Sequence, residues 1–145
     1  MTPSIDLNGI AHVQLTVADF DRSRAFYGRL LPAMGMVPLM DFPGAYYYCV
    51  GGRTGVAIAP AAAEHAADGF VQTRPGLHHL CFRLRSREDV DRLHALAVEI
   101  GAKIVRPPEE ANWAPGYYST LFEDPDGIRL EGNFVPGKGH LEGRP

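Results

Sequence analysis

Two histidines occupy the same place in two copies of one short sequence motif. The stretch GIAHVQLTV begins at Gly9, and GLHHLCFRL begins at Gly76. The two align without a gap, and the alignment matches His12 with His79. A carboxylate, Glu131, follows in GIRLEGNF near the end of the chain. Because imidazole and carboxylate groups are common ligands of divalent transition metals, these residue types indicate a metal site, provided that the fold brings them together.

Each of the two matched stretches alternates apolar and other residues, as a half-buried β-strand does. Successive strand side chains point to opposite faces, so the matched histidines lie opposite the apolar face. By the same rule His78 shares the apolar face, and we interpret it as a structural residue. Glu131 lies on the face of its own strand opposite Ile128 and Leu130. A lone histidine in a strand usually makes ordinary hydrogen bonds. Packing alone, however, gives no reason for His12 and His79 to occupy equivalent positions in the two copies, so the repeat favours metal binding.

A helix is predicted after each of these strands. In ADFDRSRAFYGRLLPAMG, Asp19 stands where a helix N-cap is expected. In RSREDVDRLHALAVEIG, Ser86 is followed by Asp89 at the spacing of a capping box. Gly35 and Gly101 predict the two helix ends.

Each copy continues with further short runs typical of strands, so each half is predicted to be a strand, a helix and about three more strands. We therefore expect an α+β fold in which two βαβββ modules are related by an internal pseudo-twofold axis. Module one is predicted at about residues 5–62 and module two at about 75–135, within a single domain at 1–140. Residues 136–145, rich in glycine and proline, are expected to form a flexible tail.

The composition excludes several classes of function. With a net charge of −3, the chain lacks the basic surface that nucleic acids require, and we expect no nucleic-acid partner. No apolar stretch is long enough to span a bilayer, and MTPSIDLNGI has no signal-peptide pattern. We therefore expect no membrane partner and a cytoplasmic location. The two cysteines, Cys49 and Cys81, lack CxxC spacing and are expected to be free thiols.

The chain resembles the vicinal oxygen chelate superfamily, which includes glyoxalase I, fosfomycin-resistance thiol transferases, extradiol dioxygenases and bleomycin-binding proteins. The resemblance rests on GIAHVQLTV, GLHHLCFRL and FEDPDGIRLE, and it extends from about Ile5 to Phe134. It implies that two βαβββ modules form a cupped mixed sheet, glyoxalase-like in architecture, around a divalent metal ion. The ligands that it implies here are His12, His79 and Glu131.

One departure from the family pattern bears on the reaction. Glyoxalase I typically has a fourth ligand, a carboxylate, where this chain has Ala59, and alanine cannot bind a metal. The remaining set resembles the dioxygenase and thiol-transferase branches. Extradiol enzymes, however, place a proton-donating histidine or tyrosine where this chain has Leu121 and Asn112. The reaction type, the general base and the choice among Fe²⁺, Mn²⁺, Zn²⁺ and Ni²⁺ therefore stay open.

Side chains on the strand faces near the predicted ligands are candidates for contact with a substrate. Strand alternation places at least one of Tyr46 and Tyr47, and one of Tyr117 and Tyr118, inside the cup. The segment RPPEEANWAPG is predicted to be a loop that covers the opening. The residues predicted to contact substrate are Gln14, Tyr48, Arg83, Trp113, Tyr118 and Asn133.

Two functions of different classes are compatible with these features. The first is a divalent-metal-dependent enzyme whose small, oxygen-rich substrate chelates the metal, with lyase, isomerase or dioxygenase-like chemistry. The alternative is a non-catalytic protein that sequesters a small molecule such as an antibiotic, although such proteins generally lack the three ligands. A homodimer is expected in either case, with the cup formed within one chain or shared between two.

Overall fold

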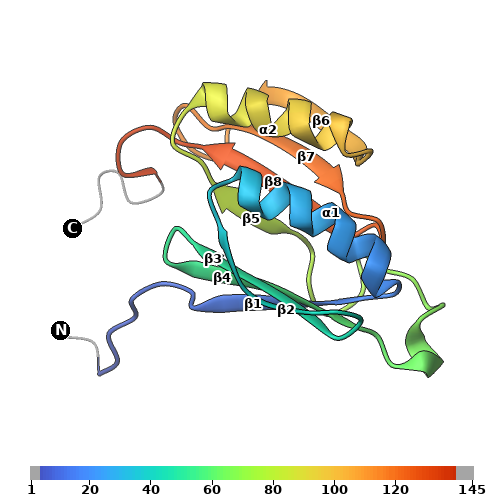
Figure 1. Cartoon of the computed structure of the whole chain (residues 1–145). Coiled ribbons are helices and arrows are strands. Elements are labelled where there is room, and N and C mark those ends of the chain that lie inside the picture. Colours follow the sequence, from blue (N-terminus) through green and yellow to red (C-terminus); the bar gives the residue numbers. More distant parts are fainter. Residues whose placement is uncertain (1–3, 140–145) are drawn as a thin grey trace. The chain divides into compact units, whose positions relative to one another are not determined.

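The structure, a computed structural model, describes residues 4–139. The chain divides into two compact units, Met1–Ala67 and Asp68–Pro145. Both units contain a strand, a helix and three further strands in that order, as Figure 1 shows. This order confirms the α+β class and the two-module repeat. None of the helices in the described residues is long and apolar enough to cross a membrane.

Unit 1 is a four-stranded sheet with one helix packed against it. Its strands are ordered β1-β4-β3-β2, with β1 parallel to β4 and the other neighbours antiparallel. Helix α1 contacts β2, β3 and β4, so it lies on one face of the sheet. The elements are β1 (His12–Val17), α1 (Phe20–Ala33), β2 (Val37–Phe42), β3 (Tyr46–Gly51), β4 (Thr54–Pro60) and a short 3₁₀ helix η1 (Ala63–His65).

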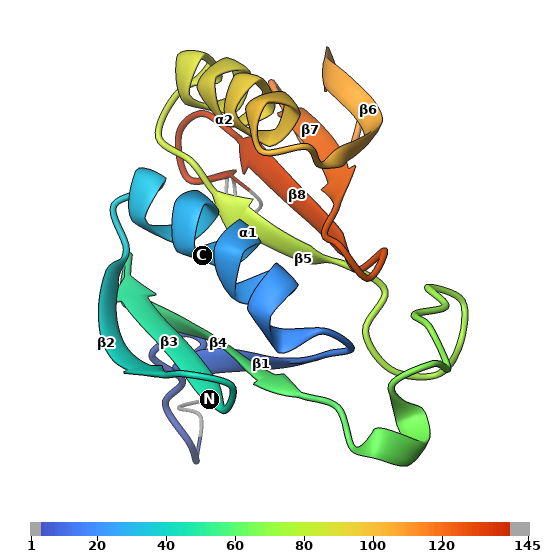
Figure 2. The ribbon, with the colours of Figure 1, turned by 45° about the vertical axis from the view of Figure 1, so that its right-hand side comes forward.

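Unit 2 repeats this plan. The strand order is β5-β8-β7-β6, again with one parallel pair, β5 and β8. Helix α2 contacts β6, β7 and β8 and lies across one face of the sheet (Figure 2). The elements are β5 (Leu80–Arg83), α2 (Arg87–Glu99), β6 (Lys103–Glu110), β7 (Tyr118–Glu123) and β8 (Arg129–Phe134).

Both helices begin and end where the sequence predicts. The Asp19 carboxylate accepts a hydrogen bond from the Arg22 backbone N–H at 3.0 Å. The Ser86 hydroxyl accepts one from the Asp89 N–H at 3.0 Å. Gly35 and Gly101 follow the two C-caps with φ of 83° and 78°, in the left-handed region that glycine adopts without steric cost. These caps fix where each chain segment leaves its helix for the next strand.

The helix-facing sides of the sheets are closely packed. In unit 2, Phe122 and Leu130 are fully buried, as is Val90 of α2. A Cβ atom added at Gly132 would lie 2.2 Å from the Leu93 side chain, so helix and strand approach closely there. Because the helix covers this face, residues of the opposite parity on β5, β7 and β8 are left for another role.

Strand β6 corrects one prediction. The residues Arg106–Glu110, expected in a loop, belong to this strand and pair with β7. Prolines are tolerated here because β6 is an edge strand, and its register shifts between Arg106 and Glu109, around Pro107 and Pro108. The loop that remains spans residues 111–117.

Only the first part of the predicted tail is described. The Gly139 N–H donates to the Pro136 carbonyl oxygen at 3.3 Å, which closes a turn over residues 136–139. Residues 140–145 of that prediction lie outside the described residues.

Candidate metal centre

Unit 2 brings two of the predicted ligands together. The His79 Nε2 atom lies 3.2 Å from Oε2 of Glu131. The parallel pairing of β5 with β8 sets Cys81 opposite Glu131, and His79 lies two residues before Cys81. Two atoms that bind one ion at about 2.0–2.2 Å each lie roughly 3 Å apart, so this separation fits a shared metal. The Glu131 side chain is 10% exposed and that of His79 is 38% exposed, so the pair is accessible from the histidine side.

The second oxygen of Glu131 is held by protein groups. The Tyr117 hydroxyl donates a hydrogen bond of 2.5 Å to Oε1, and an Nη2 atom of Arg106 lies 3.7 Å from the same oxygen. Hydrogen bonds to an ionised acceptor are short and strong. The two oxygens therefore have different partners: Oε1 faces Tyr117 and Arg106, and Oε2 faces His79.

Arg106 is itself fixed in position. Its guanidinium group donates to the backbone carbonyl oxygen of Ser119 at 3.0 Å and to the Ser119 hydroxyl at 2.9 Å. Ser119 is fully buried in β7. The positive charge near Glu131 thus belongs to a side chain that two hydrogen bonds to Ser119 hold in place.

His79 makes a second contact through its other ring nitrogen. Its Nδ1 atom lies 2.8 Å from Nδ1 of His78, which in turn lies 3.3 Å from the Gln72 side-chain amide. When one ring nitrogen of a histidine binds a metal, the other usually donates a hydrogen bond that fixes the tautomer and the ring orientation. His78 is placed to accept that bond.

This contact corrects the interpretation of His78. Strand alternation predicted that His78 would share the face of Leu80 and Phe82. The strand begins only at Leu80, however, so the alternation does not apply to the preceding residues. His78 is exposed, and its ring meets that of His79 edge-on.

Two hydrogen-bond donors beside Glu131 stay protonated at neutral pH. Burial, followed by the negative charge of Glu131, raises the pKa of the Cys81 thiol to about 12, although part of that residue is exposed. Burial and the hydrogen bond to Glu131 likewise raise the pKa of Tyr117. Neither group adds negative charge, so the Glu131 carboxylate is the negative group of this cluster.

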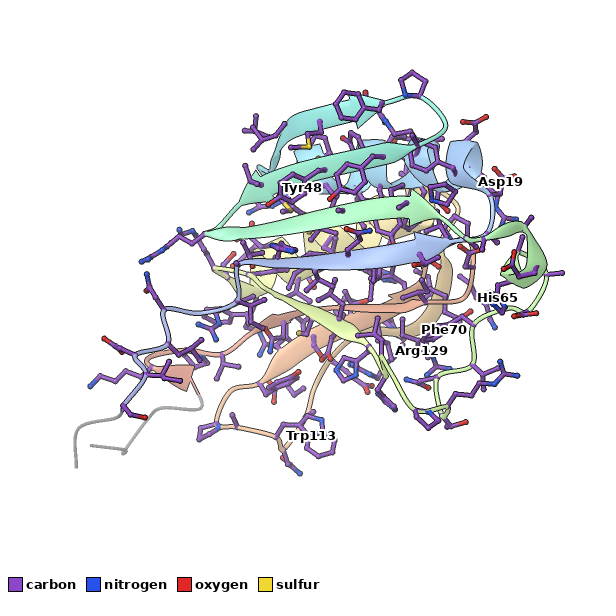
Figure 3. The ribbon with its side chains drawn as sticks, turned by 90° about the horizontal axis from the view of Figure 1, so that it is seen from below. Asp19, Tyr48, His65, Phe70, Trp113 and Arg129 are labelled. Atoms are coloured by element: carbon purple, nitrogen blue, oxygen red, sulfur yellow. The ribbon has the colours of Figure 1, made fainter. Side chains whose placement is uncertain are left out.

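Unit 1 presents a different set of residues on the matching face of its sheet. The rings of His12 and Tyr48 meet edge-on with centroids 6.5 Å apart. The Tyr46 hydroxyl donates to Oε1 of Gln14 at 3.3 Å. A Cβ atom at Gly55 of β4 would collide with the ring of Tyr48, which belongs to the neighbouring strand β3. The Tyr48 ring, labelled in Figure 3, therefore lies directly over this glycine. None of these side chains is a carboxylate.

The sheet register shows which residue of unit 1 corresponds to Glu131. Glu131 pairs with Cys81, and Gln14, the match of Cys81 in the first copy, pairs with Ala57. The register therefore gives Ala57 as the counterpart, whereas the sequence alignment gave Ala59. Either residue lacks a ligand atom, so unit 1 supplies no carboxylate at this position.

The described residues of neither unit contain a group of three or more histidine, cysteine, aspartate or glutamate side chains that could hold a metal ion. Unit 2 brings together two of the three predicted ligands, His79 and Glu131, and the third, His12, belongs to unit 1. The three-ligand set remains a prediction.

The residues predicted to contact substrate fall into different environments. Tyr118 faces helix α2: its hydroxyl donates to Asp91 at 2.7 Å, and the Arg87 guanidinium carbon lies 3.9 Å from the centre of its ring. Asn133 pairs with Arg83 across β8 and β5 and lies within hydrogen-bonding reach of Tyr117. Trp113 is 77% exposed on the loop between β6 and β7 (Figure 3). Gln14 and Tyr48 lie on the face of His12.

Three residues contact His79 or Glu131 without having been predicted to do so: no signal in the sequence pointed to Arg106, His78 was interpreted as structural, and of the pair Tyr117 and Tyr118 the predicted contact was Tyr118. A signal for Tyr117 was present. Tyr118, Thr120 and Phe122 share one parity, and Phe122 is the apolar residue expected to face a helix. Tyr117, outside that set, was therefore the better candidate of the tyrosine pair.

The profile of the Glyoxalase/Bleomycin resistance protein/Dioxygenase superfamily matches residues 9–131, which span both units. The chain belongs to this superfamily.

The chain is also similar to individual proteins, two of them solved structures whose names belong to this superfamily or are related to glyoxalase. Uncharacterized protein YqjT of Bacillus subtilis (strain 168) is 26% identical over 83% of this chain and 94% of its own length. A glyoxylase/bleomycin resistance protein/dioxygenase domain from Frankia sp. EAN1pec is 28% identical, with a TM-score of 0.72 over 89% of this chain and 98% of that domain. A glyoxalase-related enzyme from Fulvimarina pelagi is 25% identical, with a TM-score of 0.68 and 90% of each chain covered.

Proposed function

We propose that this chain is a divalent-metal-dependent enzyme of the vicinal oxygen chelate type, acting on a small, oxygen-rich organic substrate that chelates the metal. The chemistry is of the lyase or isomerase kind, or dioxygenase-like. The observation that supports the proposal most is the 3.2 Å approach of His79 Nε2 to Glu131 Oε2. Each member of the pair also has a further contact, Tyr117 with Glu131 and His78 with His79. Such contacts orient the ligands of a metal, whereas a simple surface ion pair does not require them.

His79 and Glu131 are proposed as two ligands, and the sequence repeat supports His12 as the third. We also propose that the protein is a homodimer and that it is located in the cytoplasm. His12 then comes either from the same chain as His79 and Glu131 or from the second chain of the dimer. Light scattering that gives a monomer with full metal content would contradict a site shared between chains. The ion is Fe²⁺, Mn²⁺, Zn²⁺ or Ni²⁺, and when bound it supplies Lewis-acid stabilisation of negative charge on substrate oxygens.

The protein's own residues set the electrostatics of the site. Glu131 is the one negative ligand of the proposed set, so its charge offsets only part of a divalent charge. The positive remainder favours substrates with negatively charged or strongly polarised oxygens. His78 orients the His79 ring through the contact between their Nδ1 atoms.

Metal analysis of protein purified without chelator tests the proposal. We expect about one ion per chain in the wild type, loss of that ion in His79→Ala, and its retention in His65→Ala, which removes an exposed histidine of η1. A wild-type protein that is free of metal and remains so after incubation with each of the four ions would contradict the proposal. Tight binding of a bulky apolar ligand by such a protein would support the antibiotic-sequestering alternative.

A further inference from the structure

We propose that Tyr117 is a positioning residue that makes Glu131 a ligand through one oxygen only. The inference deepens the proposed function and rests on it. Tyr117 donates to Oε1 at 2.5 Å, whereas His79 Nε2 lies 3.2 Å from Oε2. A carboxylate whose Oε1 accepts a short hydrogen bond offers its other oxygen, Oε2, on the side of the histidine.

The position of Tyr117 is built by the loop that precedes β7. The Tyr117 N–H donates to the Ala114 carbonyl oxygen at 3.1 Å, and the Tyr117 carbonyl accepts from the Ala111 N–H, also at 3.1 Å. The residue is 8% exposed. These bonds hold the Tyr117 backbone from both sides, and the buried side chain directs its hydroxyl to Oε1 of Glu131.

Gly116, which precedes Tyr117, adds to this constraint. Its φ is 75°, and a Cβ atom there would lie 2.7 Å from the Pro136 ring. A residue with a side chain would be strained in this conformation and would displace the proline. The loop at residues 111–117 therefore positions Tyr117. The sequence had predicted only that this segment covers the opening of the site.

One-oxygen binding matters for a substrate that chelates. If the bound ion were octahedral, with about six positions, His12, His79 and one oxygen of Glu131 would occupy about three of them. A substrate with two oxygens would then leave one position for a further reactant. If Glu131 bound through both oxygens, that last position would be filled, so the Tyr117 hydrogen bond preserves room for a two-component reaction.

The test compares Tyr117→Phe with Tyr118→Phe. Each change removes one tyrosine hydroxyl that donates to a carboxylate, but Tyr118 bonds to Asp91 of α2 and not to Glu131. Mn²⁺ is titrated into each metal-free protein, and water-proton relaxation reports both the affinity and the number of rapidly exchanging waters on the ion. Circular dichroism checks that both variants are folded.

We expect about three such waters in the wild type and in Tyr118→Phe, with equal affinities. In Tyr117→Phe we expect about one water fewer and a roughly 10- to 100-fold weaker affinity. An unchanged water count in Tyr117→Phe overturns the inference, even if affinity falls, while leaving the proposed function standing. A wild-type protein that binds none of the four ions overturns the proposed function, and this inference with it.

Discussion

The two units have the same order of elements but differ in the charge on the sheet face opposite the helix. In unit 2 that face carries Glu131, with a hydrogen bond from Tyr117 and the positive charge of Arg106 nearby. In unit 1 the corresponding residue is Ala57, flanked in the sheet by Gln14 and Tyr48. A buried carboxylate costs free energy unless hydrogen bonds and opposite charge compensate it. Both units have a histidine at the matched position, but the described contacts that stabilise a carboxylate, from Tyr117 and Arg106, belong to unit 2.

This difference assigns separate roles to the two halves of the repeat. Unit 2 provides charge and fixed hydrogen-bond directions, whereas the face of His12 provides aromatic and amide groups, Tyr46, Tyr48 and Gln14. Groups of the second kind suit contact with the carbon skeleton and neutral polar atoms of a ligand.

Placing the acid in unit 1 is expected to have the largest effect. Ala57 is 1% exposed and is flanked in the sheet by Gln14 and Tyr48, neither of which carries positive charge, so Ala57→Glu buries a carboxylate without the positive charge that Arg106 supplies in unit 2. We expect the free energy of unfolding in urea to fall by about 2–4 kcal/mol. Ala59→Glu, at a half-buried position, is the control and should change it by less than about 1 kcal/mol. Equal stability of the two variants would show that the lack of that positive charge is unimportant.

Replacing His78, the neighbour of the proposed ligand His79, makes unit 2 resemble unit 1. Ala11 precedes His12, whereas His78 precedes His79, so His78→Ala copies the first arrangement. Loss of the contact between the Nδ1 atoms should weaken the affinity for a divalent ion about 10- to 100-fold in isothermal titration. Gln72→Ala, which leaves the histidine pair intact, should have a smaller effect. If His78→Ala binds metal as tightly as the wild type, His78 does not orient the ligand.

The smallest effect is expected from the charge pair on the helix side of unit 1. Arg24 donates two hydrogen bonds to Asp41, at 2.9 and 2.6 Å, and these hold the pKa of the Asp41 carboxyl below its ordinary value of 3.8. Because the pKa of Asp41 is lower in the folded protein than in the unfolded chain, its charge stabilises the fold at pH values above the ordinary pKa. This stabilisation is lost as the pH falls through the lowered pKa of the folded protein.

Arg24→Met should therefore return the Asp41 pKa toward 3.8 in an NMR titration of the carboxyl carbon. Because the pair is exposed, the difference in unfolding free energy between Arg24→Met and the wild type should be small at neutral pH. The contribution of the Asp41 charge to this difference in unfolding free energy should vanish in strong acid, because Asp41 is then protonated in both proteins. An unchanged titration of Asp41 in the variant would contradict the assigned cause.

The elements of this fold could be predicted from the sequence because local signals mark their ends. Asp19 and Ser86 accept backbone hydrogen bonds as N-caps, and Gly35 and Gly101 adopt the expected positive φ. The repeat also singled out His79, because it matches His12 in the first copy, and strand parity placed Glu131 on the face away from the apolar residues. A single strand read alone would not have identified either residue as a candidate ligand. Features encoded by local chemistry or by internal repetition could therefore be predicted.

Contacts across the sheet could not be predicted in the same way. Alternation held inside the strands but not at His78, which lies just before β5. The register of β8 against β5 differs from that of β4 against β1, so aligned sequences gave Ala59 where the sheet gives Ala57. The contact of Arg106 with Glu131 spans β7, and no spacing along the chain encodes it. Register is set by packing and turns, which the sequence specifies only collectively.

The two prolines of β6 have a consequence for how this protein behaves at high concentration. An edge strand exposes N–H and C=O groups that can template a strand of another molecule. Pro107 and Pro108 lack N–H groups, and the register shift around them breaks the spacing that a continuous ladder would need. The covalent structure of the backbone itself therefore disfavours fibre-like growth of the sheet along this edge, and a change of salt or pH does not remove that effect.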